Sequence, residues 1–307
     1  MIEHAGRLAS ALSALRPEAP AVKLYKLTPD GRSWLLYAPK FWPASATELD
    51  SLWRERPIEA TKGLIMGREV AFPRRTRAYG HDYQYTGQTQ LALPFRDAHT
   101  LVQTASSALG SLGRLNSALV NWYDASEGEY MGAHSDDERA LVRHAPIISL
   151  SWASPGHYRR FRFTVRKGCR DAVLPAWQSA PGVLELRNGC LLVMGGDCQR
   201  THKHELMKPT KALGESTGKR INLTLRAFAV EPETATSSAS SVVRKRPRES
   251  HVSEVIPAGT NHGPVRPESG PRPAHRTLDA SGSAPVQSSS YFEDDGFDEE
   301  ALVRACL

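Results

Sequence analysis

The segment His134-Ser-Asp136-Asp137-Glu138 lies near the middle of the chain, and the fold must hold its side chains in the geometry of a binding site. His134 and Asp136 are two residues apart, and side chains at positions i and i+2 of an extended strand leave the same face. An imidazole and a carboxylate placed in this way can bind one cation. The same pattern is also typical of a solvated turn before a strand, so a metal site needs further ligands.

A third ligand candidate lies in the segment His202-Lys-His204-Glu-Leu. Two histidines and one carboxylate that leave the opposite side of the metal open are the ligand set of non-haem Fe(II) oxygenases. Alternation along a strand places His202 and His204 on the same side, so the periodicity leaves both as candidates.

A later segment, Arg220-Ile-Asn222-Leu-Thr224-Leu-Arg226, alternates polar and apolar residues over its whole length. One face is apolar and packs, and the other carries two arginines, an asparagine and a threonine. A buried face with two arginines needs an anionic partner, and a dicarboxylate such as 2-oxoglutarate would provide one. An exposed sheet face is the alternative. The two arginines are roughly 20 Å apart along a strand, so both serve one ligand only if their side chains converge or the strand bends.

The ordered set of these motifs is more specific than any one of them. Asn-x-Tyr at residues 121–123, His-x-Asp, a distant His and Arg-x-Asn-x-Thr-x-Arg resemble, in this order, the AlkB family of Fe(II)/2-oxoglutarate dioxygenases. The resemblance runs from about Trp34 to Val230 and is strongest to the branch that repairs duplex DNA. It implies a double-stranded β-helix, or jelly roll, with Fe(II) in its mouth. In the family pattern a basic or Pro-containing turn follows the distal histidine, which favours His204, with Lys208-Pro209 after it.

The resemblance also implies the cosubstrate contacts and the reaction. Arg220 would pair with the distal carboxylate of 2-oxoglutarate and Arg226 with the carboxylate nearer the metal, while Asn121, Tyr123 and Asn222 would form hydrogen bonds with it. With O2, the enzyme would remove methyl groups as formaldehyde from bases such as 1-methyladenine and 3-methylcytosine in DNA, releasing succinate and CO2. The alternatives are an RNA demethylase, an oxygenase that acts on protein, and a catalytically weak module that binds damaged DNA.

Residues from about 63 to 90 mix arginines and aromatic residues with Gly and Pro. Arginines between aromatic residues are used to hold phosphates while bases stack, although a hairpin with solvated arginines has the same composition. The resemblance implies a nucleotide-recognition lid, with Met66 at the tip where the duplex-acting branch typically has Phe. The expected substrate contacts are Met66, Arg74, Arg75, Tyr83, Tyr85, Asp137 and Glu138. Asp137 and Glu138 have the alternative of capping a helix over 138–142.

Periodicity and turn signals predict a mainly β body of the α+β class with flanking helices. Strands are expected at 33–37, 118–123, 146–152 and 160–166, and a hairpin is expected to join 183–186 to 190–194 through Asn188-Gly189. Helices are expected after the capping box Ser45-x-x-Glu48 and over 100–112.

The 307 residues carry a net charge of +6, which suits a polyanionic partner such as DNA or RNA. We expect a flexible N-terminal arm over 1–30, with a short helix over 5–15 as a candidate within it, one oxygenase domain over 31–230 and a disordered tail over 231–307 that is rich in Ser and Pro. In the tail, the basic cluster Arg244–Arg248 is typical of a nuclear import signal or a phosphate-binding patch, with a chance run of charge as the alternative. The acidic end 291–303 predicts a peptide for a protein partner. The cysteines show no Cys-x-x-Cys pair, which predicts an intracellular protein, and the lack of a long apolar run predicts no membrane span. We also expect a monomer that acts in the nucleus.

Overall fold

The computed structural model describes residues 1–229 apart from 66, 86–87, 137, 178–179 and 212–217, and for 64–65, 83–85 and 88 it describes the backbone alone. The predictions for the tail, including its basic cluster and acidic end, lie outside these residues. In the part of the chain that is described, no helix is long and apolar enough to cross a membrane.

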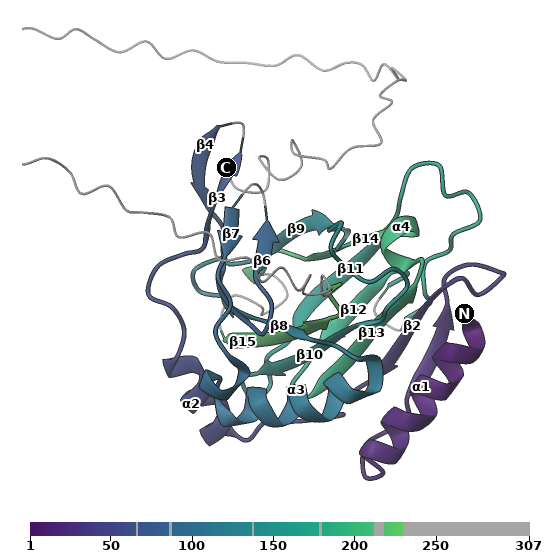
Figure 1. Cartoon of the computed structure of the whole chain (residues 1–307), viewed down its shortest axis with the longest axis horizontal. Coiled ribbons are helices and arrows are strands. Elements are labelled where there is room, and N and C mark those ends of the chain that lie inside the picture. The colour runs from purple at the N-terminus through teal and green to yellow at the C-terminus, as the bar shows by residue number, and fades with distance from the viewer. Residues whose placement is uncertain (66, 86–87, 137, 178–179, 212–217, 230–307) are drawn as a thin grey trace, which may run out of the picture. The chain divides into compact units, whose positions relative to one another are not determined.

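Two antiparallel sheets form the body of the protein (Figure 1). In spatial order the larger sheet contains β1 (Lys23–Lys26), β2 (Ser33–Ala38), β13 (Cys190–Gly196), β10 (Ile147–Ala153), β15 (Lys219–Arg226), β8 (Ser117–Asp124) and β5 (Arg75–Tyr79). The smaller sheet contains β12 (Val183–Leu186), β11 (Arg159–Val165), β14 (His202–Leu206) and β9 (Met131–His134). Apolar side chains of both sheets, among them Leu192 and Phe163, share one buried cluster. The expected mainly β jelly roll is confirmed.

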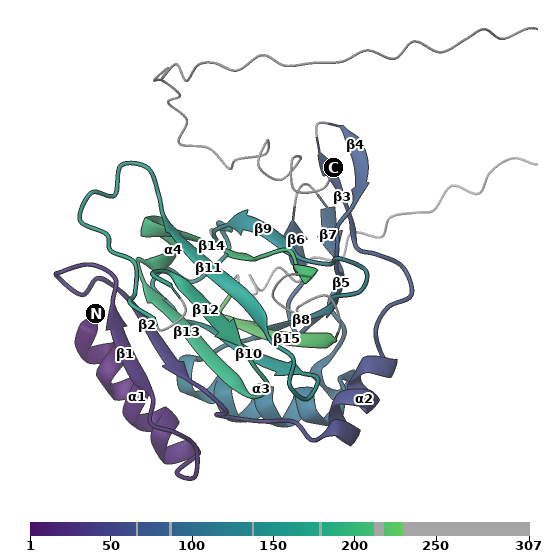
Figure 2. The same ribbon diagram turned by 180° about the vertical axis from the view of Figure 1, so that it is seen from behind.

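Three helices cover the outer face of the larger sheet (Figure 2): α1 (Ile2–Leu15), α2 (Ala46–Arg54) and α3 (Thr100–Gly113). Their buried residues form a second cluster with the sheet, which includes Ile221, Leu223 and Leu225 of β15. Because side chains alternate along a strand, the polar residues of β15 must face the opposite way, toward the smaller sheet. The helices therefore decide which face of β15 is available to a ligand.

The N-terminal segment differs from the flexible arm expected for residues 1–30. Ala5, Leu8 and Leu12 lie on one face of α1 and are buried in the cluster under the larger sheet. Residues three and four apart lie on the same side of a helix, and this stripe gives the helix a reason to pack. The expectation of an arm was wrong because a short, alanine-rich segment can still bury a leucine stripe.

Asn188-Gly189 is a turn, but it does not close the expected hairpin. β12 pairs with β11 in the smaller sheet, whereas β13 pairs with β10 and β2 in the larger one. Gly189 has a φ of +81°, and a Cβ at this position would lie 2.6 Å from the backbone nitrogen of Pro43. Glycine is needed here because the chain passes close to another backbone as it changes sheets.

The other expected elements are present, with small changes at their ends. α2 begins at the capping box formed by Ser45 and Glu48, with both reciprocal hydrogen bonds in place. The lid segment forms two short hairpins, β3 (Lys62–Ile65) with β4 (Arg68–Ala71) and β6 (Tyr83–Tyr85) with β7 (Gln88–Gln90). The remaining short helices are η1 (Phe95–Asp97) and α4 (Cys198–Thr201).

Candidate metal and cosubstrate site

Three potential metal ligands meet at the edge of the smaller sheet. His134 is the last residue of β9 and pairs with His204 of β14 in the ladder, while Asp136 follows two residues after β9. One ligand atom from each of these residues lies within 4.8 Å of the other two. Two imidazoles and one carboxylate at this separation fit a single Fe(II) ion, since they match the facial ligand set and leave positions open.

The histidines are held in a form that can bind a cation. His134 Nδ1 lies 2.9 Å from the carbonyl oxygen of Gly132, so this nitrogen donates and Nε2 is left as the ligand atom. Burial lowers the pKa of His134, and burial together with the nearby His134 lowers the pKa of His204 to about 3. Both rings are therefore neutral at neutral pH, as metal ligands must be.

Asp136 is ionised and oriented by an arginine. Burial alone would raise the pKa of its carboxyl group, but Arg226, His204 and His134 together hold that pKa below its ordinary value. Arg226 Nη2 donates to Asp136 Oδ1 over 2.9 Å. Arg226 thus touches a candidate ligand directly and shares the cavity described below.

His202 lies outside the ligand set. Its Nδ1 is 2.8 Å from Thr201 Oγ1, and its Nε2 is 3.1 Å from the carbonyl oxygen of Val173. Both ring nitrogens are engaged in hydrogen bonds, and the ring is buried within ring-contact distance of Phe163. Although His202 and His204 share a face of β14, only His204 joins His134 and Asp136.

A cavity of about 50 Å³ lies between the sheets beside these residues, several times the space that one water molecule needs. Its walls contain the three ligand candidates and an apolar patch that includes Leu119, Met131 and Leu206. All five residues expected to contact the cosubstrate line it: Asn121, Tyr123, Arg220, Asn222 and Arg226. The two arginines at the ends of β15 therefore converge on one cavity despite their separation along the strand.

Arg220 is a buried cation whose hydrogen bonds within the described part of the chain are to neutral groups. Its Nη2 donates to Ser151 Oγ over 2.8 Å and to Asn222 Oδ1 over 2.7 Å, and its guanidinium lies 5.2 Å from the centre of the Tyr123 ring. Burial lowers its pKa to about 10. Among the described residues no carboxylate forms an ion pair with Arg220, and its buried Nε has no hydrogen-bond partner. This environment fits the carboxylate of a bound ligand.

Two serines that support Arg220 were missed in the sequence. Ser149 and Ser151 lie on β10, beside β15, and Ser149 Oγ donates to Asn222 Oδ1 over 2.9 Å. The segment Ile147–Trp152 was expected only as a buried strand. Two serines at alternate positions in an otherwise apolar strand were the available signal, because buried hydroxyl groups need partners.

The expected substrate contacts divide into separate groups. Arg74 is buried, lines the cavity and donates to Met131 Sδ. Glu138 lines a neighbouring cavity of about 320 Å³ that also touches Asp136, in a turn rather than the alternative helix. The backbone of Tyr83 and Tyr85 forms β6, whereas their side chains, Met66 and Asp137 lie outside the described residues.

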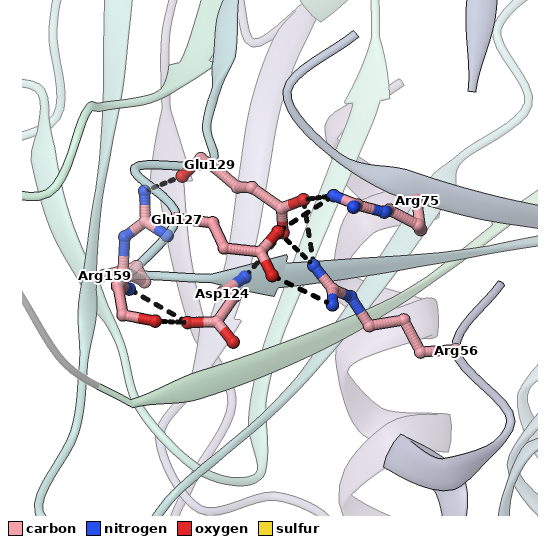
Figure 3. A network of polar contacts seen from close by, with 7 residues as sticks. Arg56, Arg75, Asp124, Glu127, Glu129 and Arg159 are labelled. Carbon is pink, nitrogen blue, oxygen red and sulfur yellow. Dashed lines mark hydrogen bonds and ion pairs between the residues drawn. The ribbon is translucent and has the colours of Figure 1, made fainter. Parts of the chain in front are cut away.

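Arg75 has a different environment from the phosphate contact expected for it. Its guanidinium forms ion pairs with Glu127 and Glu129, and Arg56 pairs with the same two carboxylates (Figure 3). Glu129 is buried, and its Oε2 accepts a hydrogen bond from the backbone nitrogen of Asp124 over 2.6 Å. Arg75 therefore joins the root of the lid to the loop before β9.

The chain is similar to several known proteins. The sequence profile of the 2OG-Fe(II) oxygenase superfamily matches residues 47–226. The "DNA oxidative demethylase ALKBH2" of Arabidopsis thaliana is 28% identical over 213 residues, which cover 62% of this chain and 65% of that protein. The human protein of the same name is 30% identical over 167 residues, which cover 53% of this chain and 59% of that protein.

Two further likenesses are to proteins of other kinds. The "RNA replication protein" of Grapevine virus A (isolate Is 151) is 26% identical over 172 residues, which cover 55% of this chain and 8% of that protein. A solved structure titled "The structure of OsALKBH1" aligns with 67% of this chain and all of its own at 16% identity, and its TM-score of 0.40 is too low to carry an argument. The chain spans less than two thirds of the length of the curated relatives described here.

Proposed function

The chain belongs to the 2OG-Fe(II) oxygenase superfamily and is AlkB-like, and from this premise we propose that it removes methyl groups from alkylated bases in DNA. The observation that carries the proposal is the juxtaposition of two sites in one cavity. One is the set His134, Asp136 and His204, and the other is Arg220, a buried cation that pairs with no carboxylate among the described residues. Arg220 would be expensive to bury without a ligand of opposite charge.

The residues divide the work between a metal and a dicarboxylate. His134, Asp136 and His204 would hold Fe(II), and Arg220 would bind the distal carboxylate of 2-oxoglutarate through a charge-assisted fork. Tyr123, Asn121 and Asn222 would orient the same molecule. When bound, Fe(II), 2-oxoglutarate and O2 supply the oxidising chemistry of the superfamily, with succinate and CO2 as coproducts.

The proposed substrates are bases such as 1-methyladenine and 3-methylcytosine, which would lose their methyl group as formaldehyde. Such a methyl group lies on the pairing edge, so the base must leave the stack to reach the cavity. The two lid hairpins belong to the segment that would contact the nucleic acid, and the curated ALKBH2 relatives, whose printed name is DNA oxidative demethylase, support DNA as the partner. Action as a monomer in the nucleus, with residues 244–248 as an import signal, belongs to the same proposal.

The test is mass spectrometry of defined methylated oligonucleotides after incubation with protein, Fe(II), 2-oxoglutarate and ascorbate. Wild-type protein should remove the methyl group from DNA, and His134→Ala, Asp136→Ala and His204→Ala should each abolish turnover. His202→Ala is the matched control on the same strand face and should keep measurable activity, because His202 is engaged with Thr201 and Val173.

Methylated RNA of the same sequence forms the second arm of the experiment. Faster turnover of the RNA would replace the DNA proposal with the RNA alternative. Succinate release without any change in either nucleic acid would indicate a protein substrate, and no succinate release from folded protein would leave only a binding module.

A further inference from the structure

The position of Asp136 relative to the two histidines is not set by the β-ladder. β9 ends at His134, and the register of its pairing with β14 shifts between His204 and Leu206. Asp136 follows two residues later, where its backbone has no strand partner. Its carboxylate must nevertheless lie within ligand distance of both imidazoles, so other contacts have to fix its backbone.

The segment just before His204 supplies these contacts. Gln199 lies in α4, and its Oε1 accepts a hydrogen bond from the backbone nitrogen of Asp136 over 3.0 Å. Ser135 Oγ donates to the carbonyl oxygen of His202 over 2.9 Å. Arg166 Nη1 donates to the carbonyl oxygen of Gln199 over 3.2 Å and lies 3.5 Å from Ser135 Oγ.

The side-chain amide of Gln199 is oriented by hydrogen bonds at both its oxygen and its nitrogen. Its Nε2 donates to Met194 Sδ over 3.3 Å, so the oxygen is directed toward Asp136. The assignment of oxygen and nitrogen follows from chemistry, because a backbone N–H needs an acceptor and the amide nitrogen offers none. Asp136 is buried, so its N–H would lose its protein partner if this oxygen were removed.

We propose that Gln199 is a positioning residue that fixes Asp136 against His134 and His204 and thereby sets the affinity of the metal site. The inference rests on the proposed metal site. One short stretch, residues 199–204, then provides the third ligand and also fixes the second. Groups that orient metal ligands in this way typically change metal affinity by 10- to 100-fold when they are removed.

The test measures Co(II) binding to the full chain without nucleic acid or 2-oxoglutarate. Affinity is read by competition with a chromophoric chelator, and ligand geometry by the visible absorption of bound Co(II). Gln199→Met keeps an unbranched side chain of similar length but removes the acceptor, so affinity should fall by about 10- to 100-fold and the absorption should change. Gln199→Glu keeps an oxygen at the same place and should restore most of the affinity.

Two controls distinguish this positioning role from the general effect of losing a side-chain amide, and its failure from failure of the proposed metal site. Gln103→Met removes an amide that donates to the carbonyl oxygens of Arg96 and Ala98, away from the site, and should leave Co(II) binding unchanged. Equal affinity of Gln199→Met and wild type overturns the inference, as does a lower melting temperature of metal-free Gln199→Met with unchanged affinity. If wild type binds Co(II) no better than His204→Ala, the metal site is wrong as well.

Discussion

Two strands at different places in the larger sheet carry arginines, and their surroundings are opposite. On β15, Arg220 and Arg226 face the cavity between the sheets. On β5, Arg75 and Arg77 point to the other side, where Arg75 pairs with Glu127 and Glu129, and Arg77 lies over the Trp122 ring. The direction follows from alternation, since Ile221, Leu223 and Leu225 pack under the helices and send the polar residues of β15 inward.

The difference between the two strands teaches how to separate a binding arginine from a structural one. Arg75 is mostly buried but has two carboxylate partners inside the protein. Arg220 is fully buried and, within the described residues, its hydrogen bonds run only to neutral groups. Burial of a charge costs several kcal/mol unless an opposite charge or a ligand offsets it. A buried arginine that pairs with no carboxylate among the described residues, rather than an arginine as such, indicates a candidate site for an anion.

The largest expected effect comes from removing the cavity arginine. Arg220→Met should leave the distal carboxylate of 2-oxoglutarate buried without a partner, a loss of about 2–5 kcal/mol in binding. The KM for 2-oxoglutarate should rise about 30-fold or more, and Arg220→Lys should lie between this variant and wild type, since it keeps the charge but loses the planar fork. Succinate release measured against 2-oxoglutarate concentration gives both values.

The matched control for this prediction is Arg75→Met. It removes an arginine of the neighbouring region without touching the cavity, so the KM for 2-oxoglutarate should stay at the wild-type value. A raised KM in Arg75→Met, or an unchanged one in Arg220→Met, would remove the distinction between the two strands.

The second expected effect is on stability, and it concerns Arg75, whose removal should leave the KM unchanged. Arg75→Met leaves the carboxylate of the buried Glu129 with Arg56 as its remaining ion-pair partner among the described residues. The free energy of unfolding should fall by about 2 kcal/mol, less than for a buried pair that loses its sole partner. Denaturant unfolding measures the change, and the exposed Arg96→Met should stay within about 0.5 kcal/mol of wild type. A drop of the same size in both variants would mean that the network adds nothing specific.

Much of the fold could be predicted from local patterns. The capping box at Ser45, the alternation over 220–226 and the apolar strand after Pro146 each correspond to an observed element. These signals depend on contacts within a few residues, which the sequence states directly. The Asn188-Gly189 turn shows the limit, because the dipeptide predicts a turn but not which sheet the next strand joins.

The members of the candidate site could be predicted from periodicity, but the choice between two of them could not. Periodicity gave both His202 and His204, and the family resemblance favoured His204; in the structure, the contacts of His202 with Thr201 and Val173 separate the two. Likewise, Arg74 and Arg75 are neighbours in sequence but one lines the cavity and the other forms ion pairs with acids about fifty residues away. Such choices depend on long-range packing, and sequence spacing carries no information about it.

The third prediction concerns pH and the histidines that face the interior. Burial lowers the pKa of His134, His202 and His204 in the folded protein. The unfolded chain, with histidine pKa values near 6.5, therefore binds protons that the folded chain does not, and stability falls as the pH drops below about 6.5. Each such histidine contributes up to about 1.4 kcal/mol per pH unit.

His202→Gln isolates one of these contributions, because His202 lies outside the ligand set. The free energy of unfolding of the metal-free variant should decrease less steeply than that of wild type between pH 7 and pH 5, by up to about 1.4 kcal/mol per unit. This window lies above the ordinary range of Asp136, so the carboxylate does not interfere. Parallel curves for the two proteins would mean that His202 is protonated equally in both states.

The smallest expected effect tests whether the lid contacts nucleic acid. Met66 falls between β3 and β4, next to Gly67 with its φ of +75°, although its own placement lies outside the described residues. A hairpin tip that fills the gap left by a flipped base must stack to offset a few kcal/mol of unstacking, and a Met side chain fills such a gap less rigidly than Phe. Wild type should therefore act on both duplex and single-stranded substrates. Met66→Phe should raise the ratio of duplex to single-strand turnover by about fivefold, equivalent to about 1 kcal/mol of stacking. Met66→Ala should lower this ratio.

Arg68→Ala, at the exposed start of β4, is the control: it should slow turnover of both substrates alike and weaken their salt dependence. A ratio that stays constant across Met66→Ala, wild type and Met66→Phe would show that the hairpin tip plays no part in opening the duplex, and the lid would then be, like Arg75 at its root, a structural region.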